Sequence, residues 1–149
     1  MKAALKFFLF VHSFFMLAMG MFGPIYAIFV KEIGGDILTA GAAWSVFMVV
    51  SGVGIFFMGK IQDRIKKEKQ VIVFGYFLTA IGILGYFFVT KPPHLFYVQI
   101  ILGLSSAILT PAWDSYYTKF LEKGKFASQW AAWESLYCII VGIAALIGS

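Results

Sequence analysis

The sequence predicts an all-α membrane protein, a polytopic bundle of transmembrane helices, and its composition and hydropathy support this class. Hydrophobic residues make up 61% of the 149-residue chain and charged residues only 13%, with a mean hydropathy of +0.89. A soluble domain carries nearer to about 25% charged residues, enough to cover its surface. With so few charges, much of the outer surface must be apolar, and only lipid accommodates such a surface.

Five apolar stretches are each long enough to cross the hydrocarbon core, which takes roughly 20 helical residues. An unpaired backbone is too costly in lipid, so these stretches are predicted to be helices. Glycine pairs and proline pairs in the short connectors agree with this division, because they interrupt helices. We expect the helices at residues 5–30, 38–59, 71–90, 95–114 and 129–148.

The basic residues predict the orientation, because Lys and Arg concentrate in cytoplasmic loops. Only Lys31 and Lys91 fall on one predicted side of the membrane. The other side receives ten of the twelve basic residues, namely Lys2, Lys6, Lys60, Arg64, Lys66, Lys67, Lys69, Lys119, Lys123 and Lys125. This asymmetry predicts a cell (plasma or inner) membrane protein with its N-terminus in the cytoplasm and its C-terminus outside. Because these charges form short runs between apolar stretches rather than one basic surface, a nucleic-acid partner is not expected.

The loop between the second and third predicted helices carries the most specific pattern in the chain. Residues 59–67 read Gly-Lys-Ile-Gln-Asp-Arg-Ile-Lys-Lys. This segment resembles the motif G-x-x-x-D-R-x-G-R-R/K, which members of the major facilitator superfamily carry between helices 2 and 3. Gly59, Asp63 and Arg64 match in type and spacing, and Lys67 keeps the positive charge. By this resemblance, the chain corresponds to the first five helices of a twelve-helix transporter, an incomplete N-terminal transmembrane domain over residues 1–149.

Elementary chemistry suggests a role for each residue of this loop motif. Gly59 lets a neighbouring helix approach closely, and Asp63 suits the N-terminus of a facing helix, where the dipole favours an anion. Arg64, Lys66 and Lys67 suit carboxylates or lipid phosphates. In the family such a cluster latches the two halves of the transporter, so the missing C-terminal helices are the expected partner. The alternative is an ordinary basic loop with a solvated aspartate.

The sequence also departs from the family pattern. Lys66 replaces the second glycine of the loop motif, and Glu68 stands where a further basic residue is usual. In the fourth helix, where the family often shows R-x-x-x-G, Gln99 and Gly103 keep the spacing without the arginine. The glutamine removes the basis for proton antiport through this position, although it remains a candidate for the substrate path.

Three ionisable residues within or beside the predicted spans are further candidates. His12 lies inside the first helix, where it is a candidate to bind substrate or relay a proton. The alternative is a structural role, in which it hydrogen-bonds a neighbouring helix or reaches the interface. Asp114 ends the fourth helix, as a latch partner of the basic loop or as a solvated interfacial carboxylate. Glu134 lies about a turn and a half into the fifth helix, facing either the pore or the interface.

The expected function is secondary transport of a small solute by alternating access, as the family resemblance implies. The alternative is a small polytopic membrane protein with an accessory or assembly role and no transport. No enzymatic activity and no cofactor is expected, since the sequence shows no paired catalytic groups, phosphate loop or metal-ligand cluster, and its single cysteine, Cys138, lies in an apolar run. The lipid bilayer is an expected partner. No motif in the sequence specifies the substrate or the coupling ion.

Overall fold

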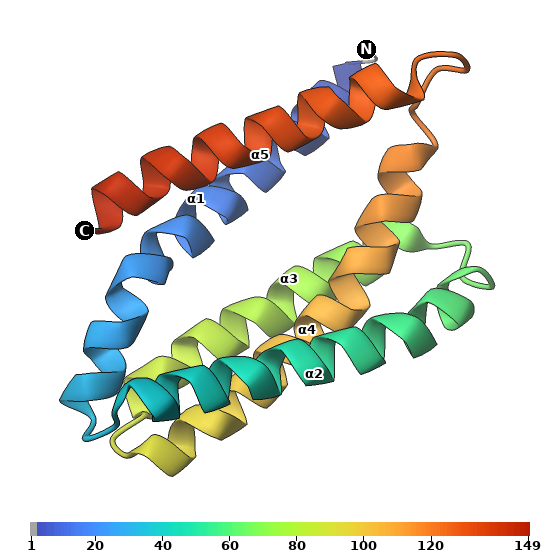
Figure 1. Ribbon diagram of the computed structural model, residues 1–149. Helices are drawn as coiled ribbons and strands as arrows, with labels where there is room; N and C mark the ends of the chain where they lie inside the picture. The colour runs from blue at the N-terminus through green and yellow to red at the C-terminus, as the bar shows by residue number, and fades with distance from the viewer. Residues whose placement is uncertain (1–2) are drawn as a thin grey trace. The chain divides into compact units, whose positions relative to one another are not determined.

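The computed structural model describes residues 3–149, and within that range it is built from helices with no strand. Each helix has the length and hydropathy needed to cross a membrane, which confirms the predicted class. Lys2 lies outside the described residues. Figure 1 shows the helices in chain order: α1 (Ala3–Glu32), α2 (Ile37–Gln62), α3 (Glu68–Gly85) continued by the 3₁₀ turn η1 (Tyr86–Phe88), α4 (Pro92–Thr118) and α5 (Phe126–Gly148).

The turn between α1 and α2 shows how local sequence sets the helix ends. Gly34 adopts a φ of 84°, which a residue with a side chain rarely takes, and its N–H donates to the Lys31 carbonyl at 3.1 Å. Asp36 then caps α2, because its carboxylate accepts hydrogen bonds from the Thr39 amide and hydroxyl, both at 2.7 Å. One helix thus ends and the next begins within a few residues.

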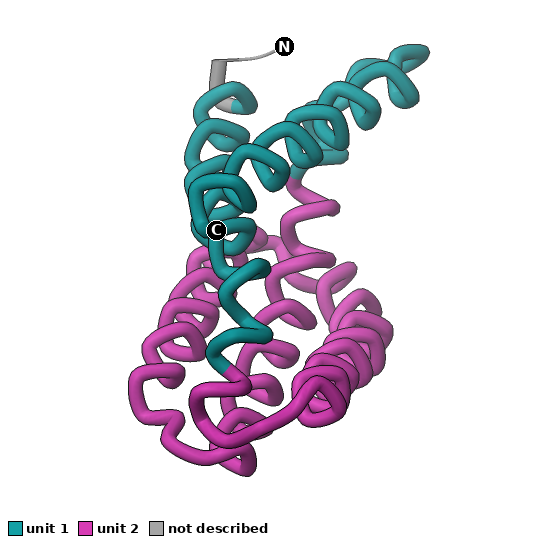
Figure 2. Tube along the Cα trace, turned by 60° about the vertical axis from the view of Figure 1, so that its left-hand side comes forward, with its two compact units in different colours: residues 1–29, 117–149 teal, residues 30–116 magenta. Residues whose placement is uncertain are grey.

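The chain divides into two compact units, coloured separately in Figure 2. One consists of the chain up to Phe29 together with Tyr117–Ser149, and so contains most of α1 and all of α5. The other, Val30–Tyr116, contains α2, α3 and most of α4. Each unit packs through small residues, as transmembrane helices commonly do.

In the Val30–Tyr116 unit, α2 and α4 run parallel and in close contact. A Cβ built on Gly103 would lie 2.9 Å from Val50 Cβ, and one built on Gly54 would collide with Ala107 Cβ. The Ser51 hydroxyl also donates to the Gly103 carbonyl at 3.4 Å. Glycines therefore let the two backbones approach each other.

The third helix runs antiparallel to α4 in the same unit. A Cβ on Gly75 would lie 2.9 Å from Leu109 Cβ. The Gly75 carbonyl accepts hydrogen bonds from the hydroxyls of Thr79 and Ser105, at 3.0 and 2.8 Å. Half of the most apolar segment of α4 is buried, against 22% for α3, so α4 is the more enclosed helix.

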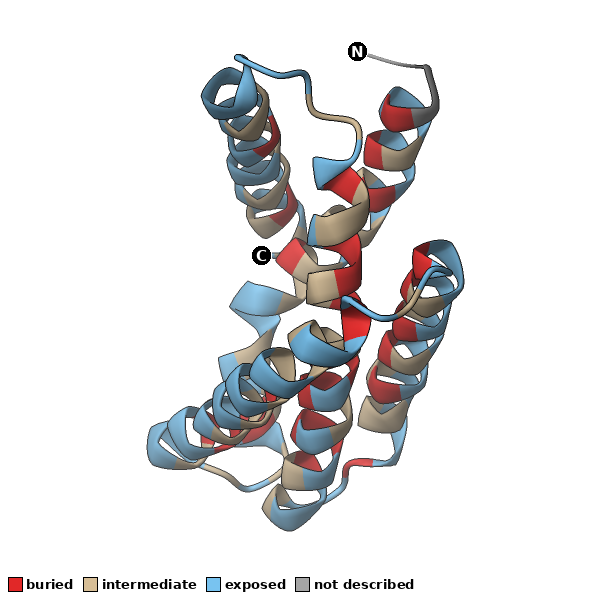
Figure 3. Cartoon of the chain, turned by 90° about the vertical axis from the view of Figure 1, so that its right-hand side faces the viewer, coloured by how far each residue is buried: buried red, intermediate tan, exposed pale blue. Residues whose placement is uncertain are grey.

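In the other unit, α1 and α5 run parallel. A Cβ on Gly20 would lie 2.7 Å from Ala144 Cβ, and one on Gly148 would collide with the Met21 carbonyl. Figure 3 shows exposed residues beside buried ones on the helices. Many of the exposed residues are large and apolar, including Leu146 of α5. Apolar exposure of this kind fits a surface in contact with lipid.

Candidate functional site

The loop between α2 and α3 is a tight turn that presents its charges outward. Asp63 ends α2, with its N–H donating to the Gly59 carbonyl at 3.2 Å. The next two amides donate back to Ile61 and Gln62 at 3.0 and 2.9 Å, which closes the turn. The charged side chains of this loop are exposed, namely Asp63, Arg64, Lys66 and Lys67.

These four charged side chains form no ion pair or hydrogen bond within residues 3–149. A Cβ on Gly59, one turn earlier on α2, would likewise meet no described atom within 4 Å. The face expected to receive a neighbouring helix is thus left uncovered by the other residues of the Val30–Tyr116 unit. Contacts of Gly59 and Asp63 with a further helix stay predictions.

Glu68, which departs from the loop motif, is buried between α3 and α4. Glu68 is the first residue of α3 and is only 7% exposed. It accepts a hydrogen bond from the Ser115 hydroxyl of α4 at 2.7 Å. A carboxylate also suits the first turn of a helix, where the dipole is positive. The sequence signal was available, since an acidic residue often marks a helix start.

Gln62 is a second residue that the sequence reasoning missed. Its side chain, at the end of α2, is only 4% exposed, and neither amide atom has a hydrogen-bond partner among residues 3–149. A buried amide without partners is unfavourable. No sequence signal distinguishes it, because its neighbours in the loop are polar and exposed.

Asp114 lies on α4 and is exposed, next to the Ser115 that bonds Glu68. Arg64, Lys66 and Lys67 make no ion pair with it among the described residues. Its role as a latch partner stays a prediction. The structure instead joins α3 and α4 at this end through Ser115 and Glu68.

His12 lies within an aromatic cluster of the unit that contains α1 and α5. It is 4% exposed, and its ring centroid lies 5.5 Å from that of Phe15 and 5.2 Å from that of Trp133. Trp133 lies 6.4 Å from Tyr117, whose hydroxyl donates to the Gln129 carbonyl at 2.7 Å. His12 is thus enclosed by aromatic rings, and its role in the substrate path and the alternative hydrogen bond to a neighbouring helix both stay predictions.

The remaining two candidates have opposite environments. Gln99 is 2% exposed, and its side-chain Nε2 donates to the Tyr86 hydroxyl at 3.1 Å, which ties α4 to η1. Glu134, next to Trp133 on α5, is exposed and makes no ion pair or hydrogen bond within residues 3–149. It lies eight residues after Phe126, about 12 Å along the helix axis. Glu134 is thus the candidate with an accessible charge.

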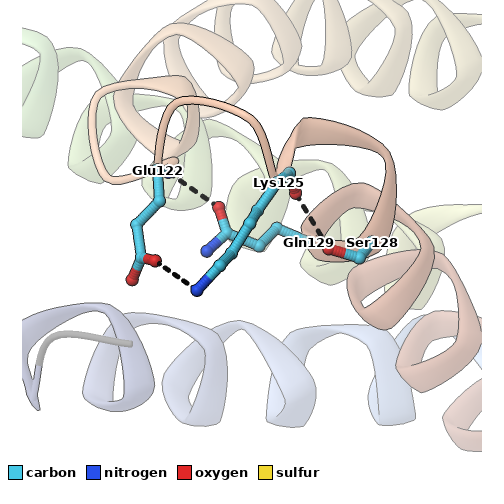
Figure 4. A network of polar contacts seen from close by, with 4 residues as sticks. All are labelled: Glu122, Lys125, Ser128 and Gln129. Carbon is cyan, nitrogen blue, oxygen red and sulfur yellow. Dashed lines mark hydrogen bonds and ion pairs between the residues drawn. The ribbon is translucent and has the colours of Figure 1, made fainter.

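The loop before α5 holds a small polar network, drawn in Figure 4. Lys125 pairs with Glu122 at 3.1 Å, and the Glu122 amide donates to Gln129 Oε1 at 2.8 Å. The Ser128 hydroxyl donates to the Lys125 carbonyl at 3.0 Å. Because the Lys125 and Glu122 side chains are well exposed, the pair contributes little stability. The network orders the start of α5.

Comparison with known proteins is consistent with this geometry. Residues 8–149 match the family model described as Major Facilitator Superfamily. An uncharacterized MFS-type transporter of Methanocaldococcus jannaschii is 29% identical over 133 residues, which cover 89% of this chain and 34% of that protein. Multidrug resistance protein MdtG of Salmonella typhimurium is 29% identical over 99 residues, 64% of this chain and 24% of that protein. The chain thus spans about a third or less of the length of these relatives. No solved structure matches it significantly.

Proposed function

The chain belongs to the major facilitator superfamily, and from this premise we propose that it forms part of a secondary transporter that moves a small solute by alternating access. The observation that carries the proposal is the uncovered, charged end of α2. Asp63 and Arg64 form no ion pair or hydrogen bond within residues 3–149, and a Cβ on Gly59 would meet no described atom within 4 Å. Alternating access needs such contacts, because they must form and break as the transporter rocks.

In this proposal, the loop after α2 latches onto helices beyond those of this chain. Asp63 would accept hydrogen bonds from the N-terminus of a facing helix, while Arg64 pairs with a carboxylate there. The relatives are about three times as long as the matched region, which leaves room for those helices. Transport therefore requires the additional helices.

We further infer that the basic ends of both units face the cytoplasm. In the Val30–Tyr116 unit, the helix directions separate Lys31 and Lys91 from the basic residues of the α2–α3 loop. In the other unit, α1 and α5 begin at the same end, where Lys6 and Lys125 lie. The positive-inside rule then puts these basic ends in the cytoplasm.

Glu134 is our candidate for the solute path. An ionised carboxylate about 12 Å into a transmembrane helix is costly against hydrocarbon, so an exposed one faces water or a partner. Trp133, next in the chain, packs inward against His12. The exposed side of α5 at this level would thus line the aqueous path between the two halves.

Thiol accessibility in intact cells tests this proposal. In a Cys138→Ala background, single cysteines replace Glu134, Lys123 and Pro92 in turn, and a membrane-impermeant maleimide is added from outside. Lys123 is exposed, so its cysteine is protected only if it lies on the far side of the membrane. We expect labelling at 92, none at 123, and partial labelling at 134 that rises when the transporter opens outward. Labelling at 123 would refute the orientation. Complete protection of 134 from both sides, measured also in inverted vesicles, would refute its place on the path and favour an accessory role.

A further inference from the structure

A groove lies beside the α2–α3 loop, on the surface of the Val30–Tyr116 unit. Its volume is about 610 Å³, within the ~300–1,000 Å³ typical of small-molecule sites. Its walls are apolar and come from three helices: Met58 of α2, Val71 and Phe74 of α3, and Ile108 of α4. This groove is open to its surroundings along much of its length, and its apolar lining can contact one side of a hydrocarbon chain.

The rim of this groove is cationic. Lys66 and Lys67 line it at the loop end, together with Gln70 of α3, and all three are exposed. The two lysines form no ion pair within residues 3–149. Glu68, the next residue in the chain, forms no ion pair with either lysine; its side chain is buried and accepts a hydrogen bond from Ser115. The rim therefore offers two free ammonium groups to an anion.

The cationic rim and the apolar walls of the groove lie at different positions along the axis of α3. Phe74 lies seven residues after Lys67, which is about 10 Å deeper into the span. The candidate membrane span that contains α3 begins at Glu68, so Lys66 and Lys67 precede it and Val71 and Phe74 lie within it. We infer that the lysines lie near lipid headgroups and the walls near acyl chains. A ligand with an anionic head and an apolar tail matches both parts.

From this arrangement we propose that the groove binds an anionic phospholipid, with its phosphate on Lys66 and Lys67 and an acyl chain along Val71, Phe74 and Ile108. A soluble metabolite fits less well, because no buried polar side chain lines the apolar part to orient it. This site is separate from solute transport and does not depend on the transport proposal.

The chain supplies a matched control for the charge. Lys60 and Lys69 belong to the same basic segment but do not line the groove. Their ammonium groups lie instead over aromatic rings, 4.3 Å from the centroid of Phe56 and 5.8 Å from that of Tyr116. Replacing either pair of lysines removes two positive charges, but only the Lys66 and Lys67 pair removes charge from the rim of the groove.

Native mass spectrometry of the protein in mild detergent, titrated with phosphatidylglycerol, measures the binding. We expect the Lys66→Gln/Lys67→Gln double variant to bind about 30-fold more weakly, because each lysine near an anionic lipid surface contributes about fivefold. The Lys60→Gln/Lys69→Gln variant should stay within about threefold of the parent, since those lysines lie outside the groove. Equal losses in the two double variants would overturn the site and indicate attraction to surface charge alone.

A second pair of variants tests the apolar part. Val71 lines the groove, whereas Val73 on the same helix is 67% exposed and lies outside it. Val71→Trp should fill the groove and displace phosphatidylglycerol, and Val73→Trp should leave binding unchanged. Unchanged binding in Val71→Trp would refute an acyl chain in the groove.

Two further ligands test whether the groove recognises an anionic lipid or only a small anion such as free phosphate. Phosphatidylcholine of the same chain length should bind at least tenfold more weakly than phosphatidylglycerol, because its head carries no net charge. Millimolar inorganic phosphate should fail to displace phosphatidylglycerol, since it cannot occupy the apolar walls. Full displacement by phosphate would overturn the proposal in favour of a small-anion site.

Discussion

The contact of α2 with α4 at Gly103 leads to a prediction whose size follows from the structure. In Gly103→Ala, the new Cβ would lie 2.9 Å from Val50 Cβ and 3.0 Å from the Phe47 carbonyl oxygen. Carbon atoms prefer separations of roughly 3.5–4.0 Å, so the helices must move apart by about half an ångström. This shift would also lengthen the 3.4 Å hydrogen bond from Ser51 to the Gly103 carbonyl.

Overpacking of this kind costs about 1–3 kcal/mol, while alanine in place of glycine gains up to about 1 kcal/mol of helix propensity. Gly52 on α2 provides the control, since a Cβ there would meet nothing within 4 Å. Gly52→Ala gains the propensity term without the clash. The free energy of unfolding of Gly103→Ala should therefore lie about 1–3 kcal/mol below that of Gly52→Ala.

The measurement is unfolding in mixed detergent micelles, followed by tryptophan fluorescence, for which Trp44 on α2 and Trp113 on α4 are natural reporters. Parent protein and both variants are compared at the same detergent composition. If the two alanine variants unfold at the same point, the close α2–α4 contact is absent and the packing argument fails.

Three further predictions concern polar residues. Gln62→Leu should raise the free energy of unfolding by about 1–3 kcal/mol in the same assay, because it removes a buried amide without partners, and a loss of stability would show that the amide is satisfied. Ser115→Ala should lower the free energy of unfolding by about 1–3 kcal/mol, because Glu68 loses the hydrogen bond that the Ser115 hydroxyl donates at 2.7 Å. An unchanged free energy of unfolding would mean that water replaces the hydroxyl. The hydrogen bonds from Thr39 lower the pKa of Asp36, so this carboxylate stabilises the fold above the ordinary pKa of about 3.9 and loses that contribution as the pH falls through the lowered value. Asp36→Ala should therefore flatten the acid limb of the unfolding midpoint plotted against pH, and an identical limb in both proteins would contradict this assignment.

The helices themselves were predictable because lipid leaves the backbone no alternative to a helix. Each expected span overlaps one α-helix, and most helices extend a few residues past the expected ends, as in α4, which begins at Pro92 and ends at Thr118. The exception is α3, which ends at Gly85, before the expected residue 90, and continues as the 3₁₀ turn η1. Turn chemistry fixed the connectors in the same way, through residues such as Gly34 and Asp36. The loop motif was also visible, since spacing along the chain is all that it requires.

The inward-facing sides of the helices could not be predicted in this way. A transmembrane helix is apolar both toward lipid and toward its neighbours, so hydropathy along the chain does not separate the two faces. The burial of His12 against Trp133 and the hydrogen bond of Gln99 to Tyr86 depend on helix packing. So does the burial of Glu68, which brings a carboxylate next to a hydroxyl 47 residues away. Sequence alone determined that these helices form, because each satisfies its backbone locally, and only the tertiary structure decided which side chains they enclose, because enclosure requires a second helix.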